Sequence, residues 1–169
     1  MRKLVYYGNE TLRMKAETVS DITQDTIDLI DTMFNIMYKE SGIGLAAPQV
    51  DLPLQVVTID IRMYDGPALA LINPVITSFS DETEPYEEGC LSLPGISETV
   101  VRPSAIEVKA LAPEGKEISF QTDGLLARVT QHELDHLNGV LFIDHIEDYK
   151  RKELTSTLKK IKKMNRKAS

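Results

Sequence analysis

The sequence His132-Glu133-Leu134-Asp135-His136 stands late in the chain and places two histidines four residues apart. Residues four apart lie on one face of an α-helix, so both imidazoles can reach a single metal ion if this stretch is helical. Glu133 would then lie beside the ion without binding it, where it can accept a proton and pass it on. The motif therefore predicts a metal-dependent hydrolase, and the competing explanation is a helix that carries these histidines by chance.

The apolar residues around the motif have helical spacing. Leu125 and Val129 fall on the same stripe as the two histidines, which predicts a helix over residues 123–137. The same periodicity predicts two further helices, over residues 23–39 and 147–165.

Short runs with strand-like composition separate these helices. They cover residues 54–59, 68–72, 105–111 and 118–121. We therefore expect one α+β domain over residues 1–169, with antiparallel sheets around a central helix that carries the HExxH motif, plus N-terminal and C-terminal helices.

A catalytic metal site of this kind needs a third protein ligand and a free position for water. One familiar extension of the motif adds a histidine after Gly139, but Phe142 occupies that place. His145 lies past the predicted end of the helix. An acidic ligand farther on, Glu147 or Glu153, would resemble the ligand set of thermolysin-type proteases.

Cys90 is the better candidate for the third ligand. It is the only cysteine of the chain, so it has no internal disulfide partner, and a thiolate binds soft and borderline metals well. A buried structural cysteine is the competing explanation. The motif around it, in residues 87–94, favours a ligand.

Three segments together resemble the peptide deformylase family: residues 42–49 (GIGLAAPQ), residues 88–92 (EGCLS) and residues 131–136 (QHELDH). They occur in the family's order and at similar spacings. The resemblance covers nearly the whole chain, including the final helix of many bacterial members. It implies a single deformylase-like catalytic domain that removes the formyl group from the N-terminal formyl-methionine of new polypeptides and releases formate.

The resemblance implies that Cys90, His132 and His136 bind one divalent metal ion and that Glu133 is the catalytic acid–base. Cysteine with two histidines suits Fe²⁺, Zn²⁺, Ni²⁺ or Co²⁺, and the resemblance favours Fe²⁺ as the physiological ion. A thiolate leaves the centre less positive than an all-histidine site would be. We therefore expect the metal to acidify water less strongly and proton transfer by Glu133 to matter more.

The oxyanion donors and the peptide cleft are also implied by the resemblance. Gln49 matches a glutamine whose side-chain amide donates a hydrogen bond to the developing oxyanion, and the backbone N–H of Leu91 is the second donor. Ile43, Gly44 and Gly89 match positions that line the peptide cleft.

The methionine side chain of such a substrate needs a flexible apolar pocket. We expect it to be lined by Ile43, Tyr86, Leu125 and Val129, for which ordinary core packing is the competing explanation. Arg128 is polar where we expect a more apolar pocket edge in related enzymes, and Ser97 stands near a position that is often basic in relatives.

Charge is unevenly distributed along the chain. The net charge is −7, yet residues 150–169 hold nine Lys or Arg, from Lys150 to Lys167, and a single acid. This basic helix either packs on the body with its charges in solvent or docks on ribosomal RNA, as similar bacterial enzymes are thought to do.

No apolar run is long enough for a membrane span, and the lone cysteine suits a reducing compartment. We expect a cytoplasmic monomer without membrane association that acts on N-formyl-methionyl peptides.

Two rival interpretations stay open at this point. The first is a zincin-type metalloprotease that cuts internal peptide bonds and in which Cys90 is incidental. The second is a non-catalytic RNA-binding or ribosome-binding module with a structural metal. It is the weaker rival, because structural sites usually have four protein ligands and only three converge here.

Overall fold

The computed structural model describes residues 1–168 and the side chains of residues 1–166, so Ser169 and the side chains of Lys167 and Ala168 lie outside the described residues. Its helices are α1 (Gln24–Lys39), α2 (Gly124–Leu137), α3 (Asp148–Glu153) and α4 (Thr155–Ala168). Its strands are β1 (Gly44–Ala46), β2 (Val56–Asp60), β3 (Ala68–Phe79), β4 (Thr83–Gly89), β5 (Ser97–Pro103), β6 (Ala105–Leu111) and β7 (Glu117–Asp123). Short 3-10 helices are η1 (Glu10–Arg13), η2 (Ala47–Val50), η3 (Arg62–Tyr64) and η4 (Phe142–His145).

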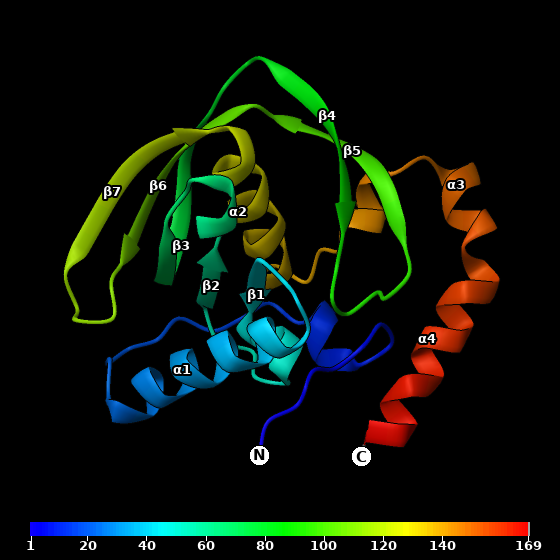
Figure 1. Cartoon of the computed structure of the whole chain (residues 1–169), viewed down its shortest axis with the longest axis horizontal. Coiled ribbons are helices and arrows are strands. Elements are labelled where there is room, and N and C mark those ends of the chain that lie inside the picture. Colours follow the sequence, from blue (N-terminus) through cyan, green and yellow to red (C-terminus); the bar gives the residue numbers. More distant parts are fainter. Residues whose placement is uncertain (169) are drawn as a thin grey trace.

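The strands form two separate antiparallel sheets. The larger has five strands in the order β1-β2-β3-β6-β7, and the smaller consists of β4 and β5 alone. Figure 1 shows α2 between the strands of the larger sheet and the β4–β5 pair, with α4 on the far side of that pair. Helix α2 thus lies where the two sheets face each other.

Helix α2 is held there by apolar packing. It starts directly after β7, and its Ala127, Val129 and Leu134 share a core with Val57 and Ile59 of β2. Most of its residues are buried, the two motif histidines included. A helix enclosed in this way holds its side chains in fixed directions, as a metal-binding pair requires.

The prediction of an α+β fold with antiparallel sheets is confirmed. The helices predicted over residues 23–39 and 123–137 begin one residue later than expected and end where expected. The helix predicted over residues 147–165 is interrupted at Leu154, so two helices, α3 and α4, stand in its place. The four predicted strands correspond to β2, β3, β6 and β7, of which β3 is much longer than expected.

Three strands were not predicted. β1 lies in the small-residue segment that resembles a loop, and β4 is so rich in acids that it shows no apolar alternation. β5 has only Val100 and Arg102 buried, because just one side of the β4–β5 pair faces the core. These strands form through backbone pairing with partners that a local pattern does not reveal.

The final helix packs on the smaller sheet. Leu158 and Ile161 of α4 are buried in one cluster with Ile96 and Val100 of the β4–β5 region and with Phe142 of η4. The apolar stripe of α4 is therefore used for packing. Within the part of the chain that the structure describes, no helix combines the length and apolar character that a membrane span requires.

Gly139 ends α2 in a conformation that no other residue fits well. Its φ is +71°, and a Cβ built on it would lie 2.6 Å from the backbone oxygen of Arg13. We expect Gly139→Ala to lower the free energy of unfolding by about 3 kcal/mol, because left-handed strain and a backbone clash add. Gly115 is the matched control. Its φ is +84° with nothing within 4 Å of a built Cβ, so Gly115→Ala should cost only the strain, about 1–2 kcal/mol. Equal losses in denaturant titrations of the two variants would refute the packing argument.

Candidate metal centre

The structure brings three predicted ligands together from two elements. Cys90 directly follows β4, whereas His132 and His136 lie one turn apart on α2. Their ligand atoms all lie within 4.8 Å of one another, and Cys90 Sγ is 3.4 Å from His136 Nε2. A sulfur and two imidazole nitrogens therefore face one point.

The two imidazoles of this cluster lie in different electrostatic environments. Burial would lower the pKa of His132, but hydrogen bonds with Cys90 and Glu88 raise it well above its ordinary value. Burial lowers the pKa of His136 well below its ordinary value, so this ring is neutral, the form that binds metals. The donor set is one thiol and two imidazoles. This donor set fits a divalent zinc-like or iron-like ion, with three protein ligands and room for water.

His132 is oriented by a buried carboxylate. Its Nδ1 donates to Glu88 Oε1 at 2.9 Å, which leaves Nε2 for the metal. Glu88 is in turn held by Arg102, whose Nε and Nη2 donate to its two oxygens at 2.7 and 3.0 Å. Burial on its own would raise the pKa of Glu88, but hydrogen bonds from His132 and Arg102 lower it well below its ordinary value. Sequence reasoning gave Glu88 and Arg102 no role, although Glu88 stands inside a recognised motif.

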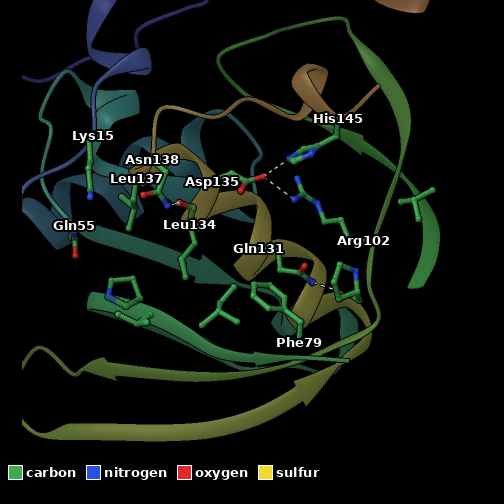
Figure 2. Close-up of a pocket in the computed structure, with 15 residues that line it drawn as sticks. Lys15, Gln55, Phe79, Arg102, Gln131, Leu134, Asp135, Leu137, Asn138 and His145 are labelled. Carbon is green, nitrogen blue, oxygen red and sulfur yellow. Dashed lines mark hydrogen bonds and ion pairs between the residues drawn. The ribbon is translucent and has the colours of Figure 1, made fainter. Parts of the chain in front are cut away.

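The same network continues to the far side of α2. Arg102 Nη1 and His145 Nε2 both donate to Asp135 Oδ2, each at 2.8 Å, and the three side chains lie together in Figure 2. They line a hollow of about 600 Å³ that is separate from the ligand cluster. His145 is thus bound to a carboxylate away from the metal ligands.

The other alternative third ligands also lie elsewhere. Glu147 precedes α3 and Glu153 ends it. Among the described residues, the only His, Cys, Asp and Glu side chains that converge as a metal-binding group are the three named above. The side chains of residues 1–166 therefore include no thermolysin-like acidic ligand.

Glu133 lies deep beside the cluster. It is 4 % exposed, and its Oε2 has no hydrogen-bond partner within the described residues. Burial raises the pKa of this carboxyl to about 7. A group with such a pKa can both accept and release a proton near neutral pH.

Gln49 and Leu91 offer hydrogen-bond donors next to the thiol. Gln49 Oε1 accepts from the Ala46 N–H at 2.9 Å, which turns its Nε2 towards Cys90 Sγ, 3.5 Å away, and Ser92 Oγ, 3.1 Å away. Within residues 1–168, the Leu91 N–H has no hydrogen-bond partner. The Leu91 N–H is available to an anion formed beside Cys90, and the Gln49 amide can turn the N–H that faces Cys90 Sγ towards the same anion.

A cleft of about 790 Å³ opens onto this cluster. Its lining includes Cys90, His132, Glu133 and Gln49, and it also includes every residue predicted to contact substrate: Ile43, Gly44, Tyr86, Gly89, Leu125 and Val129. Arg128 and Ser97 line it as well. Ser97 is exposed and pairs with Gly89 at the end of the β4–β5 ladder.

Comparisons with known proteins agree with this geometry. The family model described as polypeptide deformylase matches residues 1–152. The chain is 43 % identical over 167 residues to the peptide deformylase of Brachyspira hyodysenteriae, covering 96 % of this chain and 89 % of that protein. It is 45 % identical over 157 residues to the peptide deformylase of Cellvibrio japonicus, covering 93 % of each.

Solved structures give the same result. A peptide deformylase from Legionella pneumophila superposes with a TM-score of 0.89 at 40 % identity, covering 97 % of this chain and 96 % of that one. A peptide deformylase from Synechococcus elongatus in complex with actinonin superposes with a TM-score of 0.86 at 44 % identity, covering 94 % of this chain and 85 % of that one.

Proposed function

Since the chain belongs to the polypeptide deformylase family, we propose that it hydrolyses the N-formyl group of formyl-methionyl polypeptides and releases formate. The observation that carries this proposal is the convergence of Cys90, His132 and His136, together with a cleft that is lined by Cys90, His132 and Glu133. The family match supports this activity and gives no support to the zincin-type protease.

Cys90, His132 and His136 would hold one divalent ion, which when bound acidifies water and polarises the formyl carbonyl. Glu133 accepts the proton of the attacking water, a task that its raised pKa suits. The Gln49 amide and the Leu91 N–H donate to the formyl oxygen as it becomes anionic. Glu133 then returns the proton to the amine nitrogen as the C–N bond breaks.

The cleft also accounts for the choice of substrate. β1 is an edge strand of the larger sheet, so a peptide can extend that sheet by backbone pairing along Ile43 and Gly44. The methionine side chain would lie among Leu125, Val129 and Tyr86. A formyl group is small enough for a tight recess beside the metal that excludes acetyl.

Formate release provides the test. The full chain should release formate from formyl-Met-Ala-Ser and leave acetyl-Met-Ala-Ser intact, as measured with a formate dehydrogenase assay. The same protein should not cut internal peptide bonds of unfolded casein. Casein cleavage without formate release would overturn the proposal in favour of the protease.

Gly44 controls how closely Glu133 approaches β1. A Cβ built on Gly44 would lie 2.5 Å from Glu133 Oε1 and 2.9 Å from Val129 Cγ1. We expect Gly44→Ala to lower kcat by about 100-fold, because it displaces the catalytic carboxylate. Gly66→Ala is the steric control, since its Cβ would meet Ile61 Cδ1 at 2.4 Å without touching the cleft. An unchanged kcat in Gly44→Ala would show that Glu133 is free to move.

We assign Fe²⁺ as the physiological ion, which predicts sensitivity to air. Ferrous iron at an open site beside the Cys90 thiolate is exposed to oxidation, whereas Zn²⁺ has no redox chemistry. Protein isolated anaerobically should lose most of its activity within hours in air and keep it under argon. The Zn²⁺-loaded protein, used as the control, should lose activity equally slowly in both. Equal loss of activity in air and under argon for the protein as isolated would contradict the assignment to iron.

We further infer that a cytoplasmic monomer uses α4 to dock on ribosomal RNA. Lys159, Lys160 and Lys163 are exposed on α4, whereas its apolar stripe is occupied by packing. Replacing these three lysines with glutamine should abolish co-sedimentation with ribosomes at low salt and leave folding intact. The control with the same charge change replaces exposed lysines on the body: Lys15, Lys39 and Lys116. Equal co-sedimentation of the two triple variants would end this inference.

A further inference from the structure

The metal ligands come from two elements that share no sheet. His132 and His136 belong to α2, which packs on the five-stranded sheet, whereas Cys90 follows β4 of the separate β4–β5 pair. The position of the sulfur relative to the imidazoles therefore depends on how the β4–β5 pair sits against α2.

Arg128 of α2 fastens both strands of this pair. Its Nη1 donates to Glu88 Oε2 at 2.8 Å and to the Val100 oxygen at 2.9 Å, and its Nη2 donates to the Glu84 oxygen at 2.7 Å. Glu84 and Glu88 lie on β4 and Val100 lies on β5. The guanidinium is thus a single rigid group that joins α2 to two strands.

The guanidinium of Arg128 is directed into this junction by its hydrogen bonds. The residue is only 4 % exposed, and its guanidinium carbon lies 5.5 Å from the centre of the Tyr86 ring. Tyr86 and Arg128 both line the cleft. The positive charge of Arg128 is therefore neutralised by Glu88 and shielded by the face of the Tyr86 ring.

Arg128 reaches His132 through a shared carboxylate. Glu88 accepts from Arg128 on Oε2 and from His132 on Oε1, two residues before Cys90 in the chain. Arg102 also holds Glu88, so the carboxylate keeps a cationic partner if Arg128 is removed. The loss of Arg128 should therefore loosen the docking of β4 without leaving a bare buried charge.

We propose that Arg128 is a positioning residue that sets the place of the Cys90 thiolate relative to His132 and His136. The inference rests on the proposed function only in taking this cluster as the metal centre.

The test compares Arg128→Met with Arg128→Lys in the full chain. Methionine keeps most of the aliphatic part of the arginine side chain and removes all three hydrogen bonds. Lysine keeps the positive charge, but its single nitrogen cannot reproduce the planar, two-nitrogen contact of the guanidinium. The readouts are Zn²⁺ affinity by chelator competition, the absorption bands of the Co²⁺-loaded protein and the melting temperature. Arg128→Met should weaken Zn²⁺ binding by about 10–100-fold and shift the thiolate–cobalt bands, with Arg128→Lys intermediate.

Arg13→Met is the control, because Arg13 also donates three hydrogen bonds, two to a carboxylate and one to the Gly139 oxygen. Arg13 donates to Asp144 at 2.6 and 3.1 Å, away from the cleft. This variant should lower the melting temperature and leave Zn²⁺ affinity and the cobalt bands unchanged.

A lowered melting temperature in Arg128→Met with wild-type Zn²⁺ affinity and wild-type cobalt bands would overturn the proposal. If Arg128→Met fails to fold, the test rests on Arg128→Lys. Wild-type Zn²⁺ affinity together with wild-type cobalt bands in Arg128→Lys would then overturn the proposal. A wild-type protein that binds Zn²⁺ but releases no formate would refute the proposed function, while the metal readouts would still decide the role of Arg128.

Discussion

Glu133→Gln should lower kcat for a formyl-Met peptide by about three orders of magnitude or more while the protein keeps its metal. The amide has nearly the same shape as the carboxylate but cannot accept a proton from water, and positioned acid–base groups contribute up to about 10⁴-fold. Metal content should stay at one ion per chain, because Glu133 is not part of the converging ligand group. Formate release and metal analysis on the same preparation measure both effects.

A control variant and a stability measurement test whether the loss of activity comes from proton transfer. Glu114→Gln changes an exposed acid in the β6–β7 turn and should leave kcat at the wild-type value. The melting temperature of Glu133→Gln should not fall, since the carboxylate it replaces is buried and its Oε2 has no partner among the described residues. A Glu133→Gln variant that kept more than a tenth of wild-type kcat would show that another group moves the proton.

Gln49→Leu should lower kcat by about 100–1,000-fold with little change in KM. One donor to an oxyanion is worth about 3–4 kcal/mol, and this donor acts mainly after the formyl oxygen becomes anionic. Leucine fills a similar volume at a position that is 1 % exposed, so no cavity forms, and the melting temperature reports the cost of the acceptor that the Ala46 N–H loses.

Gln55→Leu is the control for this substitution, because Gln55 donates to the Ala16 oxygen outside the cleft. It should leave kcat unchanged. Steady-state kinetics of both variants separate stabilisation of the oxyanion, whose loss lowers kcat, from binding of the substrate, whose loss raises KM. A Gln49→Leu variant that raised KM and kept kcat would mean that Gln49 only binds the ground state.

The sequence predicted the parts of the fold that have local periodicity. Helices α1 and α2 each show an apolar stripe, and β2, β6 and β7 have runs or alternations of apolar residues. The break at Leu154 was missed because the apolar spacing continues across it into α4. β4 was missed because its stability comes from the β5 ladder and from buried polar contacts, which leave no hydrophobic pattern.

The sequence predicted the metal ligands of the site but not the arginines that support them, because only the ligands stand in motifs. Each ligand stands in a short motif, so the sequence pointed to Cys90, His132 and His136 without showing that they meet. Arg102 and Arg128 stand in no motif, and either could be an ordinary surface arginine. Only the three-dimensional arrangement shows that both converge on Glu88. Asp135 stands inside the motif, yet only the structure shows what it binds.

X-ray absorption at the metal edge tests the central geometry most directly. In the protein loaded with one equivalent of Zn²⁺, the spectrum should show one sulfur at about 2.3 Å and two imidazole nitrogens at about 2.0–2.1 Å. The sulfur signal should vanish in Cys90→Ser. A wild-type spectrum without a sulfur ligand would contradict the account, because Cys90 would then take no part in holding the metal.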